Sequence, residues 1–301
     1  MRDSQPPTPE AEDLKTPEWE VLSAADPASQ TPDFRLRKVA PPLGFEGYFE
    51  ETVLVERIRE VRALLGFNRI ESNGDFTDVT TTADGRRSPL SRSDPIWLPA
   101  SEVRGEGIFI RLKEDALAAW EARPEIRNLE TQFLYSHRAW RRLRKIRPEQ
   151  AGFPGMRFIV LHSLAHALMR QIVLDCGYTS ASIRERIFSK LPTDAHGPMA
   201  GFLIYTSATD SEGTLGGLVD LGRPISLGRN LQQTLENLRI CASDPLCSEH
   251  SPSADGRSIH GASCHACLFA PETSCERGNR YLDRCCLIST ISGKPTAFFD
   301  L

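Results

Sequence analysis

The clearest pattern along the chain is a run of apolar residues that recur at steps of three and four. This spacing is the period of one face of an α-helix, and Gly177 stands where a glycine commonly ends a helix. The pattern predicts a buried core helix over residues 157–175. The members of the run are Leu161, Leu164, Ala165, Leu168 and Ile172.

Weaker versions of the same spacing predict further helices, and short apolar runs predict strands. Ser182 and Glu185 have the spacing of a capping box and favour a helix start at 182. We therefore expect an α+β fold that is mainly helical with short strands. The helices are expected at 50–65, 113–122, 124–147, 182–191, 227–238 and 276–282, and the strands at 107–112 and 201–206.

Residues 1–33 have a different composition from the rest of the chain. They contain six prolines, eight acidic residues and two basic residues. Prolines interrupt helices and few apolar residues are present to anchor the segment, so we predict a disordered acidic tail. The segment has no apolar region of the kind found in secretory signals, and no stretch of the chain approaches the roughly 18 apolar residues that cross a bilayer. We therefore expect a cytoplasmic protein with no membrane contact.

Composition narrows the class of protein further. The chain has 301 residues, of which 40% are hydrophobic, and a net charge of −4. At roughly 150 residues per domain this size suggests about two domains, and the apolar content excludes a largely disordered chain. A slightly acidic protein must confine any surface that binds nucleic acid to a local patch. Clustered cysteines in a reducing compartment indicate metal or redox chemistry more often than disulfides.

Seven of the eight cysteines lie between positions 241 and 286. Cys264 and Cys267 form a Cys-x2-Cys turn, in which two sulfurs can converge on one ion. We predict that Cys247 and Cys275 complete a tetrahedral site for one structural zinc ion, because Cys275 precedes an expected helix whose positive end favours a thiolate. Cys241 is the alternative ligand, although it also continues the apolar series of the preceding helix.

Other interpretations of the cysteines are a set of free buried thiols or a redox sensor. Five cysteines spread over 35 residues around polar loops favour zinc over free thiols. Four protein ligands leave no coordination position for water or substrate, so the ion is expected to have a structural role. It would stabilise the fold of a C-terminal module that has too little apolar surface to fold alone. Cys285 and Cys286 are expected in the core.

A basic run near residue 140 is the candidate surface for nucleic acid. Trp140, Leu143 and Ile146 are expected to pack while the basic residues face outward and neutralise phosphates. An ordinary solvated helix end with arginines favourable to the dipole explains the run equally well. The expected phosphate-binding residues are Arg138, Arg141, Arg142, Arg144 and Lys145.

His162 and His166 lie one helical turn apart and could share a metal ion. No glutamate stands between them in the His-Glu-x-x-His pattern, so buried histidines with a structural role are favoured. The alternative is a metal-dependent hydrolase or nuclease that uses these histidines together with Asp210 or Glu212. No phosphate-binding Gly-x4-Gly-Lys-Ser/Thr pattern occurs in the chain, so helicase activity is expected only in a partner.

Several motifs together resemble the MrfA-type zinc-binding domain family, and in particular the C-terminal half of DrmB-like proteins of the DISARM antiphage system. The resemblance covers about residues 34–295. It implies a zinc-binding domain over 156–301, an α+β region with the basic helix over 34–155, and a four-cysteine zinc site at Cys247, Cys264, Cys267 and Cys275. The motifs are LHSLAHAL (161–168), GFLIYT (201–206), GTLGGL (213–218), DPLC (244–247), GASCHAC (261–267) and ETSCERGNRYLDR (272–284).

The resemblance also implies a biological setting. Related domains sit at the C-terminal end of DNA-repair helicases, and DrmB-like proteins are similar to that domain supplied as a separate subunit. A chain of this kind is expected to be a non-catalytic accessory subunit that binds DNA and docks a DISARM-type helicase.

Overall fold

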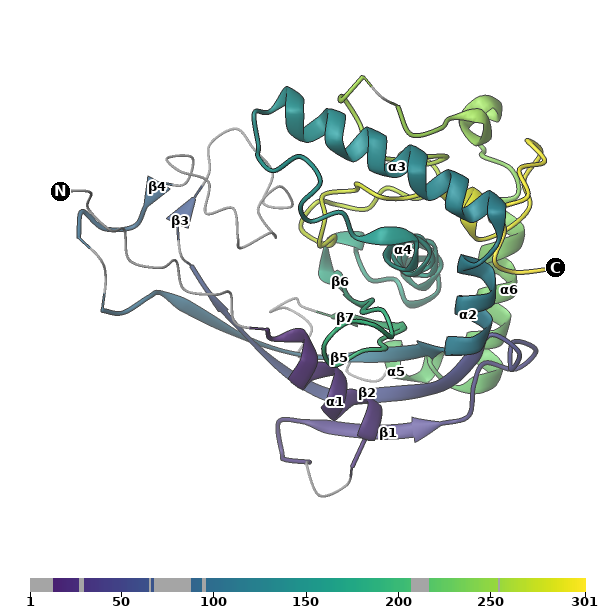
Figure 1. Ribbon diagram of the computed structural model, residues 1–301. Coiled ribbons are helices and arrows are strands. Elements are labelled where there is room, and N and C mark those ends of the chain that lie inside the picture. The colour runs from purple at the N-terminus through teal and green to yellow at the C-terminus, as the bar shows by residue number, and fades with distance from the viewer. Residues whose placement is uncertain are drawn as a thin grey trace.

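A five-stranded antiparallel sheet forms the centre of the molecule (Figure 1). The computed structural model describes residues 13–26, 30–64, 66–67, 88–93, 96–206, 217–253 and 255–301. The strands of the sheet run in the order β1-β2-β5-β7-β6, and a separate pair joins β3 (Gly66–Phe67) to β4 (Ser88–Pro89). The bounds of the central strands are β1 Arg35–Val39, β2 Phe49–Ala63, β5 Ala100–Leu112, β6 Ile183–Phe188 and β7 Gly201–Thr206.

Four of the predicted helices are present, those expected at 113–122, 124–147, 157–175 and 227–238. The core helix α4 spans Gly155–Cys176 and ends at Gly177, whose φ of 70° is left-handed and therefore suits glycine. The 107–112 and 201–206 strands are also confirmed as parts of β5 and β7. The other long helices are α2 Glu114–Glu121, α3 Pro124–Leu143 and α6 Pro224–Leu238, with a short α5 at Gly217–Leu221.

Three predicted helices are wrong. The helix expected at 50–65 falls on strand β2, which ends at Ala63, and the helix expected at 182–191 falls on strand β6. Residues 276–282 contain turns, with Asn279 and Tyr281 at a φ of 60°. In β6 the buried residues alternate with half-buried ones, so the apparent capping residue Glu185 is an inward-facing strand residue. Helices make up only 36% of the described residues, and the fold is α+β without being mainly helical.

Each face of the sheet has its own core. Ile108 and Ile110 of β5 belong to the core that contains α4, whereas Phe109 between them points to the opposite face. Helix α1 (Lys15–Ala24) covers that opposite face, where Trp19 packs against Phe109 at 5.5 Å between ring centroids (Figure 1). The expectation that prolines prevent a helix in 1–33 is therefore wrong for Lys15–Ala24, while residues 1–12 lie outside the described part.

Segments from both ends of the chain close the edge of the sheet at β6. The Glu185 backbone N–H donates to the Ser274 carbonyl at 3.2 Å. The Lys15 ammonium donates to the Ile187 carbonyl at 2.7 Å and pairs with Glu276 at 2.8 Å. Two backbone groups of this edge strand, the Glu185 N–H and the Ile187 carbonyl, are therefore satisfied by residues that are distant in sequence.

Helix α4 is long and apolar enough to meet the criteria for a membrane span, with a mean hydropathy of 1.2 over its most apolar stretch. However, 78% of that stretch is buried inside the protein. This burial is what a core helix of a folded domain shows.

Candidate metal centres

The first candidate centre is a cluster of four cysteines, Cys241, Cys247, Cys264 and Cys267. Cys241 follows the end of α6, and Cys247 lies in a short 3-10 helix, Pro245–Glu249, whose N-terminus is capped by the Asp244 carboxylate. Cys264 and Cys267 come from the Cys-x2-Cys turn, where the Cys267 N–H donates to the Cys264 carbonyl at 3.2 Å. Helix α6 and two loops therefore deliver four sulfurs to one point.

The sulfur positions of this cluster fit a zinc ion. All four sulfurs lie within 4.8 Å of one another, and three of the distances are 3.5 Å (Cys241–Cys264), 3.8 Å (Cys247–Cys267) and 3.6 Å (Cys264–Cys267). A tetrahedron with Zn–S bonds of about 2.3 Å has S···S edges of about 3.8 Å. A disulfide would need an S–S distance of about 2.05 Å. The geometry therefore supports one structural zinc ion held by four thiolates.

The structure corrects the fourth ligand. Three of the expected ligands, Cys247, Cys264 and Cys267, come together, but Cys241 takes the place predicted for Cys275. Cys275 lies in a different group of residues. Its expected role depends on a helix over 276–282, and that segment is a series of turns.

The surroundings shift the pKa values of Cys247 and Cys241 in opposite directions. Burial raises the pKa of Cys247 to about 11. Burial also works to raise the pKa of Cys241, but hydrogen bonds from the backbone N–H groups of Asp244 and Ser243 outweigh it and lower that pKa. Zinc binds thiolates, so metal binding must displace protons from this cluster and becomes weaker as the pH falls.

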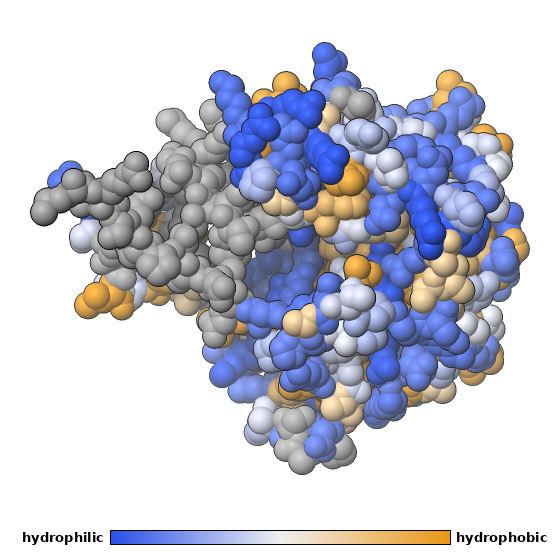
Figure 2. Space-filling model, in the orientation of Figure 1, coloured by the Kyte–Doolittle hydropathy of each residue, from blue (hydrophilic) through white to orange (hydrophobic). Residues whose placement is uncertain are grey.

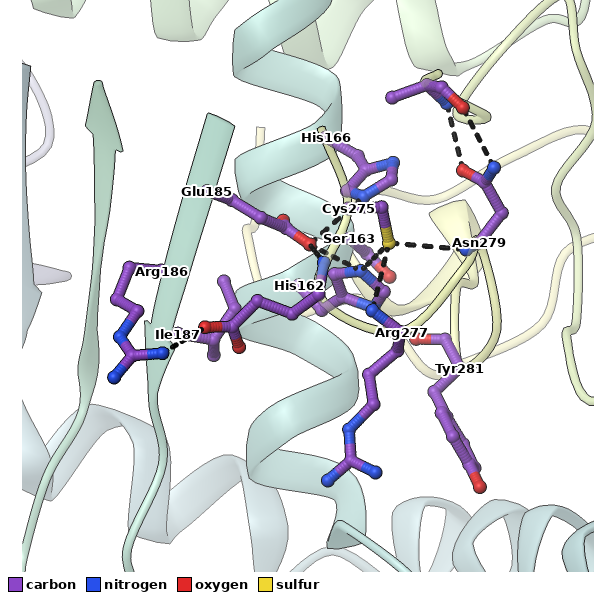
Figure 3. Close-up of polar contacts among 12 residues, drawn as sticks. His162, Ser163, His166, Glu185, Arg186, Ile187, Cys275, Arg277, Asn279 and Tyr281 are labelled. Carbon is purple, nitrogen blue, oxygen red and sulfur yellow. Dashed lines mark hydrogen bonds and ion pairs between the residues drawn. The ribbon is translucent and has the colours of Figure 1, made fainter. Parts of the chain in front are cut away.

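The second candidate centre joins His162, His166, Glu185 and Cys275 (Figure 3). Both histidines project from α4, Glu185 comes from β6, and Cys275 comes from the C-terminal segment. The two histidine side chains and the Glu185 side chain are 0% exposed, and Cys275 is 8% exposed.

The groups of the second centre are within contact distance of one another. Glu185 Oε1 lies 3.0 Å from His162 Nε2 and 3.4 Å from His166 Nε2, and Cys275 Sγ lies 3.2 Å from His162 Nε2. Burial lowers the pKa of His162, but the negative charges of Glu185 and Cys275 outweigh it and raise the pKa to about 9. Burial and Glu185 raise the pKa of Cys275, whereas the two histidines lower it and prevail.

His162 and His166 are buried, as expected, while the structural role expected for them stays a prediction. Their suggested partners for hydrolysis, Asp210 and Glu212, lie outside the described residues. Sequence reasoning missed Glu185, because its spacing from Ser182 imitates a helix cap. The alternation of Ile183, Glu185 and Ile187 is the signal that could have placed it on the buried face of a strand.

The basic segment at the end of α3 differs in part from its prediction. Arg141 is only 4% exposed and donates to the Pro148 carbonyl, so it does not face outward. Arg144 stacks over Trp140 at 4.2 Å and donates to the Gly256 carbonyl. Leu143 is 60% exposed, contrary to the expectation that it packs.

The remaining basic residues of the segment lie nearer the solvent. Arg142 and Lys145 are exposed, and Arg138 is half-buried. Arg142 shares the carboxylate of Glu149 with Arg147. The C-terminal end of α3 lies at the upper left of that helix in Figure 1, and the corresponding surface in Figure 2 is strongly hydrophilic.

Comparison with known proteins agrees with the cysteine cluster. Residues 164–268 match the family model of the MrfA Zn-binding domain, and this range contains all four clustered cysteines but not Cys275. A solved structure, the crystal structure of DUF1998 helicase MrfA bound to DNA, was also compared with the chain. The alignment covers 78% of this chain and 24% of the MrfA chain, with 14% sequence identity and a TM-score of 0.31. A score at this level does not establish a shared fold.

A relative with a curated description is similar along most of the chain. It is the DISARM protein DrmB of Bacillus paralicheniformis, which is 35% identical over 294 residues. The match covers 95% of this chain and 49% of DrmB, so the chain spans about half the length of this relative. Residues 164–268 therefore match the MrfA Zn-binding domain, and the chain resembles, over nearly its whole length, half of a DISARM DrmB protein.

Proposed function

We propose that this chain is a non-catalytic, zinc-binding accessory subunit of a DISARM-type antiphage complex, and that it acts in the cytoplasm by binding DNA and docking a helicase. The observation that carries the proposal is the four-cysteine cluster inside an MrfA Zn-binding domain, in a chain similar to DrmB over 95% of its length. Four thiolates fill the coordination of a tetrahedral zinc ion, so the ion holds a surface in shape and has no open position for a reaction.

The basic segment at the end of α3 is the proposed DNA contact. Arg138, Arg142 and Lys145 lie within about two helical turns, and the Arg142 side chain is 65% exposed. In the free protein the Arg142 guanidinium pairs with the Glu149 carboxylate. When DNA binds, a phosphate group would take the place of this carboxylate and form the same bidentate contact with Arg142. Each phosphate contact releases counterions, so binding is expected to weaken as salt increases.

Charge reversal of the basic segment tests the DNA contact. The triple variant Arg138→Glu, Arg142→Glu and Lys145→Glu is expected to lose at least tenfold in affinity for a DNA duplex and to flatten the dependence of log K on log salt by about one for each phosphate that the variant no longer binds. Fluorescence anisotropy at several salt concentrations measures both. The matched control reverses three arginines that lie elsewhere, Arg104, Arg223 and Arg229. Equal losses in the two triple variants would contradict a local DNA contact.

The end of the long β2–β5 ribbon is the proposed helicase-docking surface. Among the described residues, 59–63 of β2 and 100–104 of β5 pair only with each other, and in Figure 1 this end of the two strands extends away from the helices. Hydrophobic side chains are exposed near this end, with Ile96 at 101%, Trp97 at 71% and Val61 at 61%. A small hydrophobic patch is visible at the left edge of the molecule in Figure 2. Exposed apolar groups that gather in this way mark interaction surfaces.

Co-purification from the native host tests the assembly. The tagged chain is expected to recover a helicase, and the variant Ile96→Ser with Trp97→Ser is expected to recover at least tenfold less while keeping its zinc and its DNA affinity. The control variant Ile225→Ser carries a substitution at a residue of α6 that is 73% exposed. Recovery of no helicase or other defence protein by the unaltered chain would overturn the proposed function.

A further inference from the structure

We propose that His162, His166, Glu185 and Cys275 form a second, fully buried binding site for a divalent ion of the zinc type. These residues share no ligand with the four-cysteine cluster. Two imidazoles, a carboxylate and a thiolate are all established zinc ligands, and the mixed set of nitrogen, oxygen and sulfur suits this borderline ion. The site would join α4, β6 and the C-terminal segment (Figure 3).

The hydrogen bonds on the outer side of the two histidines show how each ring is oriented. His162 Nδ1 faces the Tyr281 carbonyl at 3.2 Å, and His166 Nδ1 faces the Leu268 carbonyl at 2.8 Å. A carbonyl oxygen only accepts, so both Nδ1 atoms must carry the proton. In a neutral ring Nε2 then offers its lone pair to the centre of the cluster. Histidines that bind metals commonly have this arrangement, with the second nitrogen donating to a carbonyl.

The distances inside the cluster match a tetrahedral centre. Bonds of about 2.05 Å to nitrogen and oxygen and of about 2.3 Å to sulfur give edges of about 3.3 Å for N···O and about 3.6 Å for N···S. The observed N···O distances are 3.0 and 3.4 Å, and the observed N···S distance is 3.2 Å. An ion at the centre requires only small shifts of these side chains.

A metal also resolves the charges of the buried cluster. Without one, hydrogen bonds from both Nε2 atoms require two imidazolium cations, and the two rings lie only 4.5 Å apart between centroids with both side chains fully buried. Like charges at that separation repel strongly where water is excluded. A divalent ion supplies the same two positive charges at one point between the anions and leaves both imidazoles neutral.

Two further observations concern the anionic ligands. Backbone N–H groups of Asn279 and Arg277 lie 3.2 and 3.4 Å from Cys275 Sγ, which is support for a thiolate. The second oxygen of Glu185, Oε2, is buried and has no hydrogen-bond partner in the described part of the protein. A buried carboxylate oxygen without a partner is costly, and a cation bound at Oε1 would offset part of that cost by stabilising the charge of the whole carboxylate.

Metal counting tests the proposal directly. We expect two zinc ions in each purified full-length chain by native mass spectrometry and elemental analysis. Cys275→Ala and Cys267→Ser are each expected to retain one ion, because they remove ligands of different sites. The control Cys176→Ala, at a half-buried cysteine outside both clusters, is expected to retain two.

X-ray absorption of the unaltered protein gives a test that needs no variant. The two sites together offer five sulfurs and three nitrogen or oxygen ligands, which averages to 2.5 sulfurs and 1.5 lighter atoms for each zinc ion. One ion per chain with four sulfur ligands and no lighter ligand would overturn the proposal and leave the cluster as a hydrogen-bonded ion network. Two ions with the mixed average establish it, whether or not the DNA and helicase contacts proposed above are found.

Discussion

Cys241 shows how one residue can satisfy two patterns. It continues the apolar stripe of α6, and it is 3% exposed, as a core residue would be. Its sulfur nevertheless lies 3.5 Å from the sulfur of Cys264. The Cys-x2-Cys pair was predictable because its geometry is local. The choice between Cys241 and Cys275 depends on where distant segments meet, and the spacing of cysteines does not contain that information.

The prediction at the residue scale follows from this choice. Cys241→Ser is expected to lose the ion of the four-cysteine cluster and to lower the melting temperature by several degrees, since metal binding and folding are linked. Cys275→Ser is expected to leave that ion in place. X-ray absorption distinguishes the two variants, because only Cys275→Ser is expected to retain a zinc ion with four sulfur ligands. Retention of the cluster's ion by Cys241→Ser and its loss by Cys275→Ser would make Cys275 the fourth ligand instead.

At the scale of elements, Arg157 ties α4 to α2. Its side chain is 1% exposed and pairs with Glu121 at 2.9 Å and with Glu114, while also donating to the Lys190 carbonyl. Burial lowers the pKa of this guanidinium, but the two carboxylates outweigh it and raise the pKa above its usual value. A forked donor that serves two carboxylates cannot be replaced by lysine.

Removing the two sides of this contact should therefore have unequal effects. Arg157→Met leaves two carboxylates that water can partly reach and is expected to cost about 1–3 kcal/mol in the free energy of unfolding. Glu114→Gln with Glu121→Gln leaves a buried cation without a charged partner and is expected to cost about 3–5 kcal/mol. Urea unfolding measures both. The control is Arg142→Met, which removes an exposed arginine from its ion pair with Glu149 and should change the free energy of unfolding little. A larger loss in the free energy of unfolding for Arg157→Met than for the double glutamine variant would contradict the claim that the unpaired buried cation is the costlier defect.

The elements also show which patterns in the sequence were informative. The helical period of the apolar residues in α4 extends over about three turns and fits only a helix. In β2, Val53, Val55, Ile58 and Val61 recur at steps of two and three, which fit a helix nearly as well as a strand. The strand prevails because β1 and β5 pair with it on both sides, a long-range effect. Helix α1 was missed because Trp19 and Leu22 find their partners only in the assembled sheet.

At the scale of the whole molecule, the two regions expected at 34–155 and 156–301 share one sheet. Strand β7 lies within the matched zinc-binding domain and pairs with β5, which precedes that domain in the chain. Ile108 opposes Ile204 in this pairing, and both belong to the core around α4. Residues outside the matched range are therefore part of the structural unit that holds the zinc-binding domain.

The closed edge at β6 leads to the prediction at this scale. Ser274, which accepts from the β6 backbone, is next to Cys275 and follows the turn of Cys264 and Cys267. Removal of zinc by a chelator is expected to free this segment and to accelerate hydrogen exchange at the Glu185 amide at least tenfold relative to the central strand β5. Mass spectrometry of exchanged peptides measures the change, and added zinc should reverse it. Unchanged protection at β6 in metal-free protein would contradict the link.

An open strand at the margin of a sheet is a template for another chain. Once Ser274 and Lys15 have moved away, β6 would offer its backbone to a second copy, and oligomers could grow by the pairing of edge strands. In a cell that lacks zinc, this protein would then aggregate through the exposed edge of β6 before the rest of the fold unfolded.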